Sequence, residues 1–134
     1  EIKWSSFNAD VKTKYILLLC ILLLIISQFI FFNASLSFQL FLITLTIFFI
    51  AFNSVEALLP SLLSRTASST KRGLAMGIFS TSQFLGTFFG GAIGGLIYDI
   101  YDLNSVFLFT IFVALIWLIL ILLMPLKTIT FKER

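Results

Sequence analysis

The sequence predicts an all-α integral membrane protein with four transmembrane helices. Hydrophobic residues make up 60% of the 134-residue chain and charged residues only 11%, too apolar a composition for a soluble domain of this size. The apolar residues form long runs without alternation, a pattern that fits membrane helices rather than strands. Basic residues gather in short segments between these runs. We therefore interpret residues 1–134 as a single transmembrane region.

Four apolar spans follow one another along the chain. They cover approximately residues 15–32, 38–63, 73–98 and 106–124. At 1.5 Å per residue, each can cross a hydrocarbon core of about 30 Å, the longer ones with tilt. The first and fourth spans are almost purely apolar, so they can face lipid over much of their circumference. Cys20, the single cysteine, is expected to be a small packing or lipid-facing residue.

The basic residues predict the orientation of the spans. They occur in alternate connections only, at Lys3, Lys12 and Lys14, then Arg65, Lys71 and Arg72, then Lys127, Lys132 and Arg134. The links at 33–37 and 99–105 contain no Lys or Arg. Because basic residues are retained in the cytoplasm, we expect a cytoplasmic loop at 65–72, a cytoplasmic tail at 125–134 and both termini inside.

Glu56 is the only charged side chain within the four predicted spans. A charge at membrane depth costs about 2.5 to 3.5 kcal/mol on insertion scales, so it persists mostly where a pathway or partner needs it. Pro60 stands four residues later and has no N–H, so we predict a break in helix hydrogen bonding that frees the Glu56 carbonyl. Asn53 shares this face of the helix. The alternative is a carboxylate without a functional role, whose side chain either extends to the lipid headgroups or forms a structural pair inside a helix bundle.

The third span combines small residues with a polar stripe. Its glycines recur every four residues, as Gly86, Gly90 and Gly94 and again as Gly91 and Gly95. Such repeats let neighbouring helix backbones approach closely in lipid. Ser80, Gln83 and Thr87 fall within about 60° of one another on the helix. We expect this stripe to hydrogen-bond either another helix or a ligand, and the sequence does not choose between them.

Several classes of function find no support in the sequence. The chain has no histidine, no paired carboxylates on one predicted helix and no phosphate-binding loop, so we expect neither an enzyme nor a metal or cofactor site. The basic residues follow the topology, so no nucleic-acid partner is predicted. Asp99 and Asp102 lie in a short outer link and are expected to be solvated.

The glycine-rich span also carries a resemblance to a known family. Its segment 86–95 reads GTFFGGAIGG. This resembles the GxxxGPxxGG antiporter motif of major facilitator carriers, with Gly91 where proline normally stands. Segments 53–65, 71–77 and 80–86 read NSVEALLPSLLSR, KRGLAMG and STSQFLG. Together they resemble the tenth and eleventh helices of bacterial drug:proton antiporters in this superfamily, and closely those of the YajR group.

The resemblance implies part of the C-terminal half of a major-facilitator-type bundle, in which the ninth and twelfth helices are peripheral. The expected function is proton-driven efflux of small molecules by alternating access, with the chain as the C-terminal segment of a twelve-helix secondary transporter. Its expected partners are the lipid bilayer, the remaining helices of the same carrier, protons and a small-molecule substrate. The expected location is the bacterial inner membrane. Glu56, Asn53, Gln83, Ser80 and Thr87 are the candidates for proton coupling or substrate binding.

Two other interpretations remain open at this point. The chain could be a small four-helix carrier that oligomerises and shares Glu56 between copies. It could also be a structural subunit of a membrane complex in which Glu56 forms an intersubunit ion pair. No residue identifies the substrate.

Overall fold

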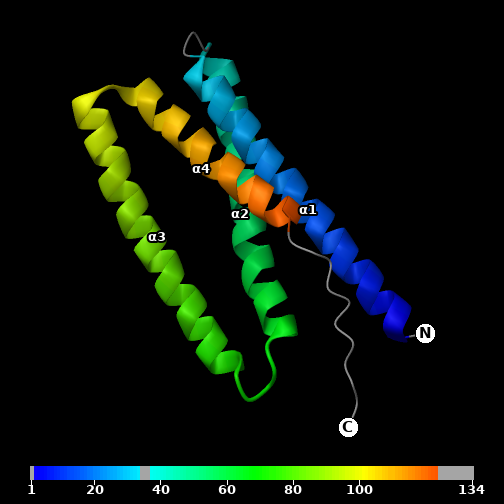
Figure 1. Cartoon of the computed structure of the whole chain (residues 1–134). Helices are drawn as coiled ribbons and strands as arrows, with labels where there is room; N and C mark the ends of the chain where they lie inside the picture. Colours follow the sequence, from blue (N-terminus) through cyan, green and yellow to red (C-terminus); the bar gives the residue numbers. More distant parts are fainter. Residues whose placement is uncertain (1, 34–36, 124–134) are drawn as a thin grey trace.

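A computed structural model describes residues 2–33 and 37–123, which form four α-helices (Figure 1). These are α1 (Ile2–Phe32), α2 (Phe38–Thr66), α3 (Arg72–Ile100) and α4 (Leu103–Leu123). The prediction of an all-α fold is confirmed. Residue 124 and the predicted tail at 125–134 lie outside the described residues.

The helices extend beyond several of the predicted spans. α1 begins at Ile2 rather than near residue 15, because residues 2–32 contain no glycine or proline to end a helix. α2 begins after Ser37, whose hydroxyl accepts a hydrogen bond from the Leu40 N–H at 3.4 Å. Such an N-cap satisfies one backbone donor at a helix start. Hydrophobic runs indicate membrane thickness, whereas caps and breakers decide where helices begin and end.

Three of the described helices are long and apolar enough to cross a membrane. The suitable segments are Lys12–Phe32, Phe38–Arg65 and Leu103–Leu123. α3 has 29 residues, a length of about 43 Å at 1.5 Å per residue. All seven glycines of the chain lie within it, together with the polar stripe, and these residues lower its hydropathy. That α3 also spans the membrane therefore stays a prediction.

α1 lies at the centre of the packing in this chain. It packs along both α2 and α4, and the buried cluster joins residues of all three helices: Leu17, Cys20, Ile21, Val55 and Ile121. The packing alternative for Cys20 is thus correct, since this side chain is buried. Among the described residues α1 is the most enclosed helix, and the peripheral position that the resemblance implies for it in the whole carrier stays a prediction.

The end of the bundle near the α1–α2 connection is joined by aromatic and polar contacts. The Phe31 ring of α1 lies between Phe41 of α2 and Phe107 of α4, with ring centroids 5.6 and 5.7 Å apart. One turn away, the Thr110 hydroxyl of α4 lies 3.2 Å from Gln28 Oε1 of α1 and 2.9 Å from the Phe107 carbonyl of its own helix, and these two acceptors share its one proton. Helices α1, α2 and α4 therefore form one packed unit.

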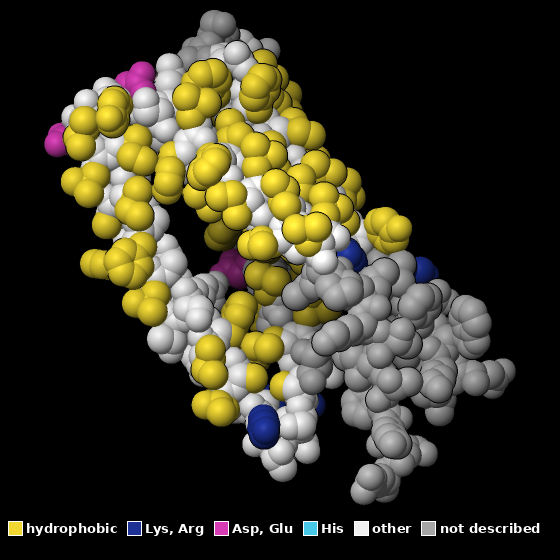
Figure 2. Space-filling view, in the orientation of Figure 1, with side chains coloured by type: hydrophobic (Ala, Val, Ile, Leu, Met, Phe, Trp, Pro, Cys, Tyr) yellow, Lys and Arg dark blue, Asp and Glu magenta, His cyan; other side chains and the backbone are white. Residues whose placement is uncertain are grey.

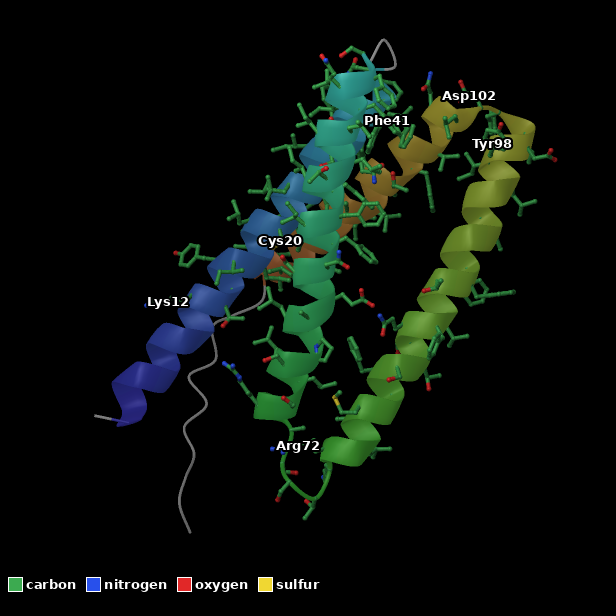
Figure 3. All side chains as sticks on the ribbon, turned by 180° about the vertical axis from the view of Figure 1, so that it is seen from behind. Lys12, Cys20, Phe41, Arg72, Tyr98 and Asp102 are labelled. Carbon is green, nitrogen blue, oxygen red and sulfur yellow. The ribbon has the colours of Figure 1, made fainter. Side chains whose placement is uncertain are left out.

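α3 stands apart from this packed unit along most of its length (Figures 1 and 3). None of its residues is buried, and its contacts with α2 and α4 are sparser than those that α1 makes. A connection at residues 67–71 ties one end to α2, and a turn at Tyr101 and Asp102 ties the other end to α4. The described chain therefore holds α3 mainly by its two ends.

Three labelled residues of opposite charge lie toward opposite ends of the molecule. Lys12 and Arg72 lie toward one end, and Asp102 lies at the other (Figure 3). Arg65 and Arg72 are helical residues that flank the basic loop. That the basic end faces the cytoplasm stays a prediction.

Candidate functional site

Glu56 of α2 and Gln83 of α3 meet across the space between their helices. The Gln83 side-chain amide donates a hydrogen bond to Glu56 Oε1 with an N···O distance of 3.4 Å. This is longer than the roughly 2.7–3.2 Å common for N–H···O bonds. Both side chains are exposed in this chain. Two site candidates from separate spans are thus brought together, and the polar stripe contacts another helix at one position.

An opening separates α3 from the rest of the molecule at this level. In the space-filling view, a gap lies between α3 and the packed unit, and an acidic side chain is visible in it (Figure 2). The hydrogen bond to Gln83 places the Glu56 carboxylate on the side of α2 that faces this gap. Within the described chain, a small cation or a water molecule can therefore reach the carboxylate without displacing a packed side chain.

The other candidates on α2 lie close to Glu56 along the same helix face. Asn53 is exposed one turn away, and Pro60 is half-buried one turn on the other side. α2 continues from Phe38 to Thr66 with Pro60 inside it. Pro60 therefore does not end the helix, and the predicted break is limited to the bond that the Glu56 carbonyl loses.

The remaining polar candidates on α3 bond locally or not at all within the described chain. The Thr87 hydroxyl donates to the Gln83 carbonyl at 3.0 Å, a contact inside α3 that leaves no donor for α2. Ser80 is exposed, and its hydroxyl has no hydrogen-bond partner among residues 2–33 and 37–123. Gln83 is thus the stripe residue that the fold connects to Glu56.

The glycines of α3 meet open space rather than a neighbouring helix of this chain. A Cβ added at Gly86, Gly90, Gly91 or Gly95 would find no atom within 4 Å, apart from its own surroundings in the helix. At Gly94 it would lie 4.0 Å from Val106 Cγ1 of α4. The close helix approach expected of these glycines is therefore not made between described helices, and it stays a prediction for neighbours outside them.

The electrostatics of the site are simple. Among the described residues, no group of three or more His, Cys, Asp or Glu side chains could hold a metal ion. Glu56 is the only charged residue in the predicted spans, and Arg65, nine residues away, is about 13 Å along the helix axis. A lone carboxylate with one amide donor can take up a proton or attract a cation.

Two structural contacts of the fold are missed by the sequence reasoning. Asp102 is exposed, as predicted, and its Oδ1 also accepts hydrogen bonds from the Ser105 N–H at 2.8 Å and hydroxyl at 2.6 Å. The hydroxyl bond and then the backbone bond lower the pKa of Asp102 from its usual 3.8. The spacing of an Asp three residues before a Ser at a helix start could have indicated this cap. No local sequence pattern could have indicated the contact between Gln28 and Thr110.

These features define a multi-pass membrane bundle whose intramembrane carboxylate suits proton or ion binding rather than covalent catalysis. Comparison with known proteins then identifies its family. Residues 4–132 match the Major Facilitator Superfamily, and the chain belongs to this superfamily. Part of a major-facilitator-type bundle is thus confirmed as the fold class.

Individual relatives agree with this assignment. The chain is 40% identical over 107 residues to the inner membrane transport protein YajR of Escherichia coli K12. It is 49% identical over 83 residues to an uncharacterized transporter of Buchnera aphidicola subsp. Acyrthosiphon pisum. These matches cover 80% and 59% of the chain, but only 24% and 21% of the relatives. The expected resemblance to the YajR group is confirmed, and so is the expectation of a transporter family rather than an enzyme.

Proposed function

We propose that this chain forms the last four helices of a twelve-helix secondary transporter, which exports small molecules in exchange for protons. The family and the names of the relatives support transport, and the order of the four helices supports the C-terminal position. Alternating access requires two opposed helix bundles around a central site. Four helices do not supply both bundles, so transport belongs to the larger carrier.

The remaining helices of that carrier are proposed to cover the open side of α3. Gly86, Gly90 and Gly91 have no neighbour in the described chain, and glycine faces in lipid commonly receive another helix. This arrangement would place the gap that Glu56 faces inside the carrier instead of at its lipid boundary. The family assignment makes this interpretation preferable to a small oligomeric carrier or a structural subunit.

Glu56 is proposed to couple protons to the transported substrate. The observation that carries this role is its contact with Gln83 on the open side of α2. An intramembrane carboxylate is costly when ionised, so a proton and a cationic group would compete for it. Asn53, Ser80 and Thr87 are proposed to line the same pathway and to contact the substrate.

The proposed location is the inner membrane of a bacterium, with both termini and the loop at 65–72 in the cytoplasm. The basic residues of this loop support that orientation. Ser68 lies exposed in the loop, so Ser68→Cys in intact cells is expected to resist an impermeant thiol reagent and to react after permeabilisation. Strong labelling from outside would contradict the orientation.

The central experiment is Glu56→Gln in the carrier that contains this chain. The amide keeps the shape of the side chain but does not titrate, so proton-driven transport should fall by at least about tenfold, whereas protein abundance should change little. Ethidium can serve as a cationic probe. Its proton-driven uptake into inside-out vesicles is compared with its downhill exchange at matched protein levels.

Asp99→Asn is the matched control, because it also removes one carboxylate, from an exposed position at the far end of α3. Transport by this variant should equal that of the wild type. Unchanged pH dependence and coupling in Glu56→Gln would leave Glu56 with a structural role only.

A further inference from the structure

α3 is connected to the packed unit by one side-chain hydrogen bond in the part of the chain that the structure describes. The Thr81 and Thr87 hydroxyls bond to carbonyls of α3 itself. Gln83 is the described α3 side chain that donates to a different helix. No residue of α3 is buried. The described helices therefore supply little apolar packing that would hold α3 in place if that one contact were broken.

The strength of this contact depends on the state of Glu56. An ionised carboxylate accepts a charge-assisted hydrogen bond that is about twice as strong as a neutral one. A proton from solution that binds the carboxylate removes this charge, and a cation that occupies it competes for the same oxygen. At 3.4 Å the bond is already long, so a small displacement of α3 is sufficient to break it.

No other charged group shares this environment among the described residues. Across the gap, the polar stripe of α3 is uncharged, and α4 has no ionisable side chain. On α1, Cys20 is buried beside Val55 in the hydrophobic cluster, while Lys12 and Lys14 precede the apolar part of that helix. The contact between the two helices therefore responds to the charge of Glu56 itself.

We propose that Gln83 is a positioning residue that holds α3 against α2 by its hydrogen bond to ionised Glu56, a contact that we call the clasp. When a proton or a cation binds the carboxylate, this bond breaks and α3 is released. This inference rests on the proposed role of Glu56, and it adds the structural consequence of occupancy. The short connections at both ends of α3 would limit the released movement to its middle, beside the gap. The movement of α3 would then transmit the protonation or cation occupancy of Glu56 to the rest of the carrier.

The test measures the distance between α2 and α3 directly. In the full carrier with Cys20→Ala, spin labels are attached at Thr46→Cys and Phe88→Cys, which replace exposed residues of α2 and α3. The purified protein is reconstituted in nanodiscs, and protons alone are the probe. As pH falls, the ratio of the longer to the shorter distance population should rise by at least about fivefold, the lower end of common coupling factors.

Three variants separate the clasp from a general structural effect. Gln83→Met keeps the length of the side chain but removes the donor, so the longer distance should predominate at every pH. Glu56→Gln should give a distribution that does not change with pH. Thr81→Val removes a hydroxyl that bonds only to the Gly77 carbonyl, and it should respond to pH as the wild type does. If Gln83→Met does not accumulate, the shorter Gln83→Asn serves the same purpose.

A pH response in Gln83→Met equal to that of the wild type would overturn the clasp, as would a pH-independent distance in the wild type. The transport assay of Glu56→Gln is read separately. Loss of coupling in Glu56→Gln together with an unaltered distance in Gln83→Met would leave the proposed function intact and reject the clasp. Normal coupling in Glu56→Gln would instead reject the proposed function.

Discussion

α1 and α3 are helices of similar length, 31 and 29 residues, yet they differ in how the chain encloses them. α1 buries Leu17, Ile21 and Ser27 against its neighbours, whereas α3 has no buried residue. The sequence favours the opposite assignment, because α3 carries the glycine repeat usually associated with close helix packing. Small residues permit a close approach, but a complementary partner surface is needed to make it.

α1 and its neighbours achieve close packing without glycine. Their most buried positions include small residues, Cys20 and Ser27 on α1 and Thr44 and Ala51 on α2. The buried hydroxyls are satisfied within their own helices, since Ser27 donates to the Leu23 carbonyl at 2.7 Å and Thr44 to the Leu40 carbonyl at 2.8 Å. Larger residues such as Ile21 fill the remaining space. This combination gives α1, α2 and α4 the buried core that α3 lacks among the described residues.

The largest effect expected from this comparison is a difference in stability between the two regions. Ile21 is fully buried and Phe84 of α3 is 75% exposed. Ile21→Ala should therefore lower the free energy of unfolding by about 2–4 kcal/mol, and Phe84→Ala should lower it by less, because no described helix encloses Phe84. Denaturant unfolding of the full carrier measures both. Equal losses would show that other helices enclose the outer face of α3.

The glycines of α3 provide the second test. Gly94→Leu would press against Val106, whose Cγ1 lies 4.0 Å from the place that a Cβ at residue 94 would take, and overpacking of this kind costs about 1–3 kcal/mol. Gly90 faces open space in this chain, so Gly90→Leu should lower the stability less than Gly94→Leu does. It should nevertheless impair transport, because another helix of the carrier is proposed to cover this face. Thermal unfolding and vesicle transport separate the two effects. Wild-type transport by Gly90→Leu would show that this face meets lipid.

The smallest expected effect concerns the turn that ties α3 to α4. The pKa of Asp102 is lowered by the Ser105 hydroxyl and N–H, so the folded protein favours the ionised form. The resulting stabilisation is present above the unfolded value of about 3.8 and is lost as pH falls through the lower folded value. Asp102→Ala should slightly lower the midpoint of thermal unfolding at pH 7 and abolish this acid dependence. Asp99→Ala, at an exposed position, should do neither.

Much of the candidate site can be predicted residue by residue. Glu56 is identified because a charged side chain in an apolar span is costly and is usually retained for a function. Gln83 is identified because it lies on a polar stripe. Their contact links positions 27 residues apart, and neither helix contains information about which face the other presents. The same limit applies to Gln28 and Thr110, which are 82 residues apart.

The amino-acid order is sufficient to establish that this protein is helical, that it belongs in a membrane and which of its polar residues are exceptional. These properties are local, because every backbone group in lipid must find its partner within its own helix. The enclosure of α1, the open position of α3 and the contact between Glu56 and Gln83 become visible only in the folded chain. Those outcomes depend on the relative position and rotation of whole helices, which shape complementarity between distant parts of the chain sets.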